Sequence, residues 1–124
     1  MTQAILQAAT VIPKTTQTLV GAEIDVTRGQ KLTVHFAYTK GDETGLKITP
    51  YFLDQLGGTK YQVNEWAATS GAWVGSPASI TLTASKTASF TWDVSGVQGF
   101  RLEVGGSNND GTPTGTFAAS YTLK

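Results

Sequence analysis

Apolar and polar residues alternate along most of this sequence, and this two-residue period constrains the fold more than any other feature. In the segment KLTVHFAYT, which starts at Lys31, the residues Leu32, Val34, Phe36 and Tyr38 fall on one face of a strand. No segment shows a convincing 3.6-residue period. Such alternation is typical of antiparallel strands that bury one face and expose the other.

The same pattern recurs between glycine-rich and asparagine-rich turns. Further alternating segments are TLVGAEIDV at 18–26, LKITPYF at 46–52, SITLTA at 79–84, SFTWDV at 89–94, GFRLEV at 99–104 and TFAASYTL at 116–123. They predict an all-β chain: a single antiparallel β-sandwich, jelly-roll-like, with about seven to nine short strands. Pro50 has no backbone N–H to donate to a neighbouring strand, so its strand is expected at a sheet edge or with a bulge. Arg101 and Glu103 are expected to face outward.

Length and charge narrow the classes of function. The 124 residues fit one domain, and nine basic residues balance nine acidic ones. The basic residues are scattered, which argues against nucleic acid and against an anionic membrane surface as partners. The absence of cysteine excludes disulfides, thiol catalysis and thiolate metal sites. No apolar run is long enough to span a bilayer and the start does not resemble a signal peptide, so synthesis in a cytoplasm is expected.

The first sixteen residues are apolar for a chain terminus. Ile5, Leu6, Val11 and Ile12 would prefer burial. Residues 1–16 therefore form either the first strand or an interaction arm that reaches a neighbouring subunit, and residues 17–124 form the sandwich domain. The four apolar residues are candidate interaction residues.

Asp42 and Glu43 are adjacent carboxylates between Gly41 and Gly45. Calcium usually requires six to eight oxygen ligands, and glycosidases place two carboxyls about 5–10 Å apart across a cleft. Two neighbouring acids beside Lys40 supply neither arrangement. A solvated hairpin tip is the favoured interpretation.

His35 is the only histidine, and it falls on the polar face of a predicted strand. Without a recognisable nucleophile motif or a second histidine, a surface or interface histidine is favoured over a catalytic base or a zinc ligand. The SNNDGTPTG segment, residues 107–115, offers oxygen donors for an ion or a sugar, but a long hairpin loop is favoured. No catalytic residue, metal or cofactor is therefore expected.

Two of the three tryptophans lie near loop-like sequence. Trp92 falls in register with Phe90 and is expected in the core, whereas Trp66 and Trp73 flank a turn-like segment. The latter two are candidates for a protein interface, for a sugar-stacking platform together with Tyr61, or for capping one end of the sandwich.

Several segments together resemble a diffuse group of small β-sandwich proteins of tailed bacteriophages. They are EIDV at 23–26, KLTV at 31–34, YTKGDET at 38–44, the strand at 46–52 and the closing GTFAASYTL at 115–123. Residues 57–79 depart from this pattern.

The resemblance implies a virion structural protein of the head decoration or cement type, and no enzyme. It implies binding to the major capsid protein at the capsid surface of the virion, as a homo-oligomer such as a trimer, after assembly in the host cytoplasm. A tail or fibre component fits the same resemblance. A carbohydrate-binding β-sandwich module is the alternative that the aromatic residues leave open.

Overall fold

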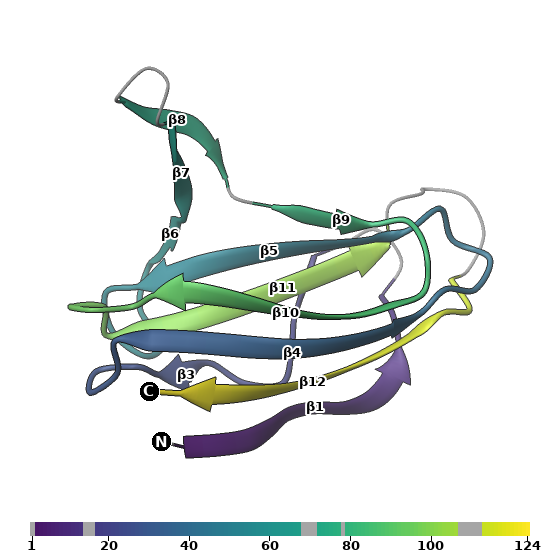
Figure 1. The fold of residues 1–124 in the computed structure, drawn as a ribbon, viewed down its shortest axis with the longest axis horizontal. Coiled ribbons are helices and arrows are strands. Elements are labelled where there is room, and N and C mark those ends of the chain that lie inside the picture. Colours follow the sequence, from purple (N-terminus) through teal and green to yellow (C-terminus); the bar gives the residue numbers. More distant parts are fainter. Residues whose placement is uncertain (1, 14–16, 68–71, 78, 107–112) are drawn as a thin grey trace.

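The chain folds into two stacked antiparallel sheets (Figure 1). The computed structural model describes residues 2–13, 17–67, 72–77, 79–106 and 113–124, with the backbone alone at 2–3, 64–67 and 72–77. We call the four-stranded sheet sheet A, with the order β1 (Thr2–Val11), β12 (Thr116–Leu123), β4 (Lys31–Thr39) and β10 (Lys86–Asp93). Sheet B has the order β2 (Thr18–Leu19), β11 (Gly99–Gly106), β5 (Leu46–Leu53) and β6 (Lys60–Gln62).

Shorter strands complete the architecture. In sheet B, β3 (Ile24–Asp25) also pairs with β11, and β9 (Ile80–Leu82) also pairs with β5. The strands β7 (Asn64–Ala67) and β8 (Ala72–Pro77) form a separate hairpin that projects from the sandwich in Figure 1. The predicted all-β sandwich is confirmed, and the described residues contain no helix. There are more strands than the seven to nine expected, because several span only two or three residues.

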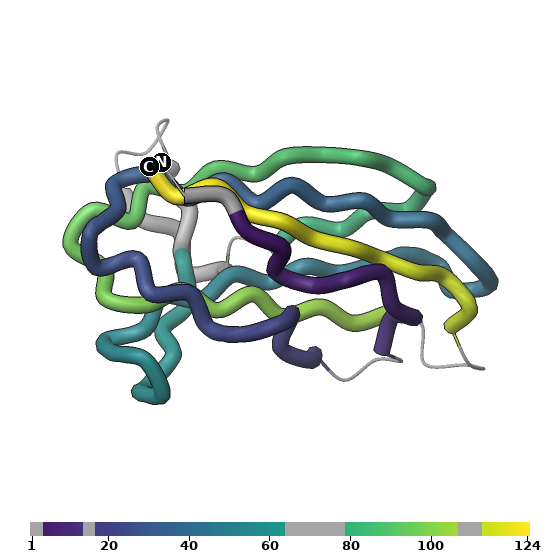
Figure 2. The backbone as a smooth tube through the Cα atoms, turned by 90° about the horizontal axis from the view of Figure 1, so that it is seen from below, coloured from purple at the N-terminus to yellow at the C-terminus, as the bar shows by residue number. Residues whose placement is uncertain are grey.

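The strands β1 and β12 run side by side, as Figure 2 shows in purple and yellow. Thr2 is paired with Leu123 at the end of the β1–β12 ladder. The strand β1 therefore forms one edge of sheet A, and β10 forms the opposite edge.

The predicted inward faces meet between the sheets. Leu32, Val34 and Phe100 are each fully buried, and the rings of Trp92 and Phe100 pack across the core with centroids 5.0 Å apart. Burial of such apolar surface supplies most of the favourable free energy of folding. The alternating pattern thus correctly predicted which side of β4, β10, β11 and β12 faces the core.

The strand that contains Pro50 is not an edge strand, which corrects the expectation from sequence. β5 lies between β11 on one side and β6 with β9 on the other, and its register with β11 continues through Pro50 without a shift. On the second side, β9 pairs with residues 46–48 and β6 with residues 51–53. Pro50 falls in the interval between these two partners, where the ladder requires no donor from it.

The expected hairpin tip at Asp42 and Glu43 is also wrong. β4 belongs to sheet A and β5 to sheet B, so residues 40–45 cross from one sheet to the other. Asp42 is exposed, but the Glu43 side chain is buried, with 1% of its surface accessible. Both carboxylates had been expected in water.

The buried Glu43 carboxylate joins three parts of the chain. It accepts hydrogen bonds from the backbone N–H of Gly41 and of Gly115, each at 2.8 Å, and from the Tyr38 hydroxyl. Burial by itself would raise the pKa of Glu43, but these hydrogen bonds outweigh it and lower the pKa to about 2. Burial, together with the same contact, raises the pKa of Tyr38.

Two glycines make this arrangement possible. A methyl group at Gly115 would collide with the Glu43 carboxylate, and one at Gly41 would collide with the backbone at Gly115. The chain can approach the carboxylate closely enough to donate both N–H groups only because neither residue has a Cβ.

We expect Glu43→Gln to lower the free energy of unfolding by about 2–3 kcal/mol at pH 7, measured by urea denaturation. Because the folded-state pKa lies below the ordinary glutamate value of 4.5, the contribution is present above pH 4.5 and is lost as the pH falls toward 2. The difference between wild type and variant should therefore shrink over this range. Asp42→Asn is the control, and an equal loss in that variant would contradict the prediction.

Candidate functional site

The outer face of sheet A contains a groove of about 590 Å³, which we call the outer groove. It is lined by Ile5, Gln7, Ala8, His35, Phe36, Ala37, Thr87, Ala88, Ser89, Ala118, Ala119 and Ser120, from all four strands of the sheet. Apart from His35, the outward side chains at its centre are small, so the surface of the sheet itself forms much of the floor. A cavity of this volume lies within the range of typical ligand pockets.

The strand register arranges the outward residues in rows across the sheet. One row contains Ser89, His35, Ser120 and Ile5, because each residue is paired with the next across neighbouring strands. The flanking rows are Thr91, Thr33 and Thr122 on one side, and Thr87, Ala37 and Ala118 on the other. The outer groove therefore presents hydroxyl and methyl groups, and one imidazole.

His35 is held by hydroxyl groups on both sides. Its Nδ1 lies 2.7 Å from the Ser89 hydroxyl oxygen and its Nε2 lies 3.4 Å from that of Thr122. A catalytic histidine that activates a serine needs a carboxylate to orient its ring. Thr122 occupies that position here, and none of the residues that line the groove is acidic. This geometry fits a surface histidine better than a catalytic base.

The outer groove is also without formal charge. Its lining contains no lysine, arginine, aspartate or glutamate. A phosphate or carboxylate ligand would find no countercharge there, so the chemistry favours a neutral partner surface.

The candidate interaction residues of the amino-terminal segment separate into two groups. Ile5 and Val11 on β1 are exposed, with 79% and 56% of their surfaces accessible. Leu6 packs against the core and Ile12 is buried within it, at 3%. The segment is a strand of sheet A, and Ile5 borders the outer groove.

The candidate aromatic platform lies on the projecting hairpin. Trp66 and Trp73 occupy directly opposed positions on β7 and β8, and their side chains lie outside the described part of the structure. Tyr61 on the preceding strand is 55% exposed. In the candidate loop at 107–115, residues 107–112 lie outside the described residues.

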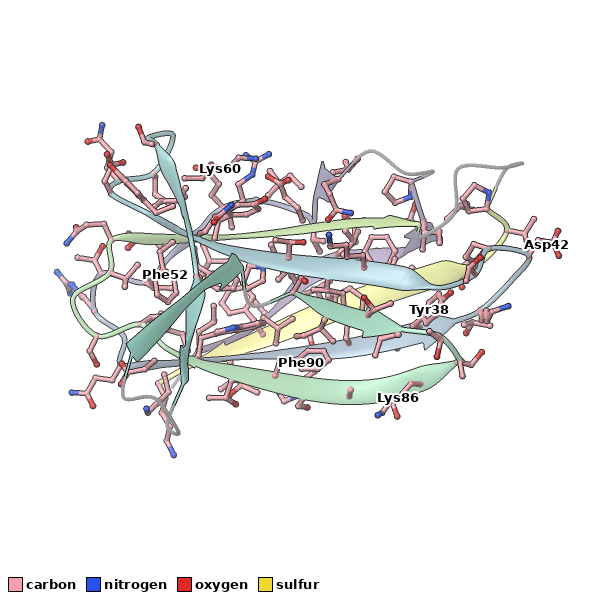
Figure 3. The ribbon with its side chains drawn as sticks, turned by 90° about the horizontal axis from the view of Figure 1, so that it is seen from above. Tyr38, Asp42, Phe52, Lys60, Lys86 and Phe90 are labelled. Carbon is pink, nitrogen blue, oxygen red and sulfur yellow. The ribbon has the colours of Figure 1, made fainter. Side chains whose placement is uncertain are left out.

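Asp42 and Glu43 do not converge on a common site. The Asp42 backbone N–H donates to the Thr114 hydroxyl at 2.8 Å, while its side chain is exposed, and Glu43 points into the protein. Figure 3 shows Tyr38 and Asp42 at the same end of the molecule. Within the described ranges, no three acidic or histidine side chains are grouped closely enough to hold a metal ion.

The outer face of sheet B differs from that of sheet A, because it carries a charged cluster. Glu103 was expected to face solvent, but only 3% of its surface is accessible. Its carboxylate lies 2.9 Å from Lys60 Nζ and 2.7 Å from Arg101 Nε, and Arg101 also contacts Glu23 at 3.4 Å. Burial would raise the pKa of Glu103, but the hydrogen bonds and charges of Lys60 and Arg101 lower it. Each charge in this cluster has a partner within the chain.

Comparisons with known proteins identify the fold. No family model matches the chain, and no curated protein matches it. The SPBc2 prophage-derived protein YomS aligns with 98% of this chain and 90% of its own, at 20% identity and a TM-score of 0.59. A structure of infectious bursal disease virus, Gx strain, aligns with 97% of this chain at 11% identity and a TM-score of 0.55.

A third similar structure is the VP2 subviral particle of infectious bursal disease virus, at 12% identity and a TM-score of 0.50 over 97% of this chain. This chain covers only 30% and 31% of the two viral chains. At such identities the likeness shows a shared β-sandwich fold.

None of the described residues forms a helix that could cross a membrane.

Sequence reasoning did not find the outer groove. The signal was present, since most of the outward positions of β4, β10 and β12 are alanine, serine or threonine. The order of the strands, which places Ser89, His35 and Ser120 in one row, does not follow from a single sequence.

We expect Glu103→Ala to lower the free energy of unfolding by about 2 kcal/mol, because it leaves two cations without their buried partner. The control is Lys31→Ala, which removes an ion pair to Asp93 whose side chains are 56% and 63% exposed. That change should cost less than about 1 kcal/mol. Equal losses in urea denaturation would show that the sheet B cluster is no more than a surface feature.

Proposed function

We propose that this chain is a non-enzymatic structural protein of a tailed-phage virion, and that it decorates the head by binding the major capsid protein. In this role it stabilises the shell by bridging capsomers. It works as a homo-oligomer on the capsid surface, and a trimer is the copy number that the family resemblance implies.

The observation that carries this proposal is the outer groove on a rigid sandwich. The groove has no lysine, arginine, aspartate or glutamate, most of its lining side chains are small, and the exposed apolar residue Ile5 stands at its border. A shallow floor of alanine, serine and threonine allows another protein to approach the sheet closely. The sandwich folds shared with a prophage-derived protein and with viral capsid chains support the choice of a virion partner.

A lattice compensates for a contact surface with little charge. Many identical copies on one shell gain avidity, because binding of one contact brings the next within reach. The balanced charge of nine basic and nine acidic residues limits repulsion between crowded neighbours. A tail or fibre component would use the same physics at another position of the virion.

A carbohydrate-binding module is the second candidate function. It is favoured by the exposed Tyr61 and by the opposed positions of Trp66 and Trp73 on the projecting hairpin. Aromatic rings at such positions can stack on sugar rings. In that case the binding surface is the hairpin and not the outer groove.

We expect Ala37→Arg to abolish co-sedimentation with purified phage heads while the melting temperature stays unchanged, because Ala37 is exposed on the groove floor. Thr81→Arg places the same charge on an exposed position of sheet B and should still bind.

Each result of this assay has a defined meaning. Full binding by Ala37→Arg would exclude the outer groove as the interface. The carbohydrate role would be favoured over the virion role by two results together. The wild-type chain would not co-sediment with phage heads, and it would be retained on a polysaccharide gel in a way that Trp66→Ala abolishes.

A further inference from the structure

The free edge of β10 is regular and carries little protection. β10 is the last strand of sheet A, and all eight residues from Lys86 to Asp93 pair with β4 without a register shift. It contains no proline, and no charged residue lies between its two ends. Natural sheets usually protect such an edge with charges, bulges or covering segments, because it can pair with another strand.

The other edge of sheet A has this protection. The ladder between β1 and β12 shifts register twice, between Ile5 and Gln7 and again between Gln7 and Thr10. The backbone N–H of Gly21 donates to the Gln7 side chain at 3.0 Å, and Gly21 also approaches the Leu6 carbonyl so closely that no Cβ would fit. Of the two edges that the structure describes for sheet A, that of β10 is the regular one.

The direction of the backbone groups on β10 follows from one hydrogen bond. The N–H of Val94, directly after the strand, donates to the carbonyl of Gln30 at 2.8 Å, in register with the β4 ladder. Since donors alternate between the two sides of an antiparallel strand, the even-numbered residues of β10 face β4. The odd-numbered Thr87, Ser89 and Thr91 therefore direct their N–H and C=O groups to the free edge.

The side chains of β10 also leave apolar surface at this edge. Phe90 and Trp92 point toward the core but are only partly buried, whereas the outward Thr87 and Ser89 are exposed. The rings of Phe90 and Trp92 contact each other, with centroids 6.3 Å apart. Figure 3 shows Phe90 and Lys86 on this strand at the border of the sandwich. A strand added beside β10 would bury both aromatic rings further.

We propose that two copies of this chain pair through β10, edge to edge and antiparallel, about a two-fold axis at Ser89. The two sheets A then become one continuous eight-stranded sheet. An axis perpendicular to the sheet keeps both inner faces on the same side, so odd-numbered residues must pair with odd-numbered ones. The odd-numbered residues are also the ones whose N–H and C=O groups point to the free edge, so this pairing can form hydrogen bonds.

The second copy fits because the strand is complementary to itself in this register. Thr87 faces Thr91 of the partner, and their backbone groups can exchange hydrogen bonds. On the inner face, the small Ala88 lies opposite Phe90 of the partner, and Lys86 lies opposite Trp92 of the partner, where a cation–π contact is available. No pair brings like charges together.

The pairing uses the backbone edge of β10, although Thr87 and Ser89 also line the outer groove, and it is a property of the free protein. It does not depend on the virion role, and its failure leaves the head-binding assay unaffected. A two-fold pair differs from the trimer that the family resemblance implies, unless such pairs link trimers into larger assemblies.

The experiment removes one edge donor and leaves the internal ladder intact. Thr87→Pro deletes an N–H that points to the free edge, and the two-fold axis doubles the loss in the pair. We expect light scattering over a dilution series to show pairs of the wild-type chain and a roughly tenfold to hundredfold weaker association for this variant. Thr87→Ala removes the same side chain but keeps the donor, and it should associate like wild type.

Thiol crosslinking tests the register independently. The chain has no cysteine, so a bis-thiol crosslinker on a single-cysteine variant can only join two copies. Ser89→Cys should be joined into a covalent dimer by a short bis-maleimide, since the Cα atoms of residues that face each other in a hydrogen-bonded pair lie about 5.5 Å apart. Ala118→Cys, on the outer face of β12 away from the edge, should not. A monomeric wild type, an assembly unaffected by Thr87→Pro, or equal crosslinking at both positions would overturn the proposal.

Discussion

The crossing between the two sheets depends on one buried carboxylate. Glu43 lies in the segment that leaves β4 and enters β5, and it holds that segment to Gly115 at the start of β12. Because β4 is the central partner of both β12 and β10, the position of this crossing fixes how sheet A lies over sheet B. A buried charge is costly unless hydrogen bonds compensate for its lost hydration. Tyr38 and two backbone N–H groups meet that requirement.

The two outer faces of the sandwich then differ in chemistry. On sheet B, Glu103 gathers Lys60 and Arg101, so the charged side chains satisfy one another within the chain. On sheet A, hydroxyl and methyl groups leave a neutral groove. A surface whose charges are already paired has little to offer a partner, whereas a smooth neutral surface can be covered at low desolvation cost. This contrast is the physical reason for placing the binding function on sheet A.

The sequence predicted the sandwich and its inward faces because each depends on local alternation. Leu32, Val34 and Phe36 were correctly placed on one face, which the structure buries, since period two alone decides the side of a strand. The errors at Pro50 and at Glu43 have a common origin. Both depend on which strands are neighbours, and a pattern read along the chain carries no information about pairing across it.

Among the candidate residues, too, some properties follow from the pattern of one strand and others depend on its neighbours. Ile5 and Ile12 look alike in the sequence, yet one is exposed beside the outer groove and the other is buried in the core. His35 was correctly placed on the polar face, but its contact with Ser89 needed the register of β4 with β10. Properties of one strand could be predicted, and properties of a pair of strands could not.

The outer groove and the free edge of β10 have a common cause in the sequence of that strand. Its outward positions hold Thr87, Ser89 and Thr91. These small side chains leave the floor of the groove open, and they also leave the middle of the strand without a charged or bulky residue that would prevent pairing at the edge. Its inward positions hold Phe90 and Trp92, which one sandwich buries only in part. A chain selected only as a free monomer would gain from a lysine at one of these outward positions, since such residues suppress pairing at edges. The lack of a charged residue between the ends of β10 is therefore better explained by association of the chain with another protein surface than by solubility of a free monomer.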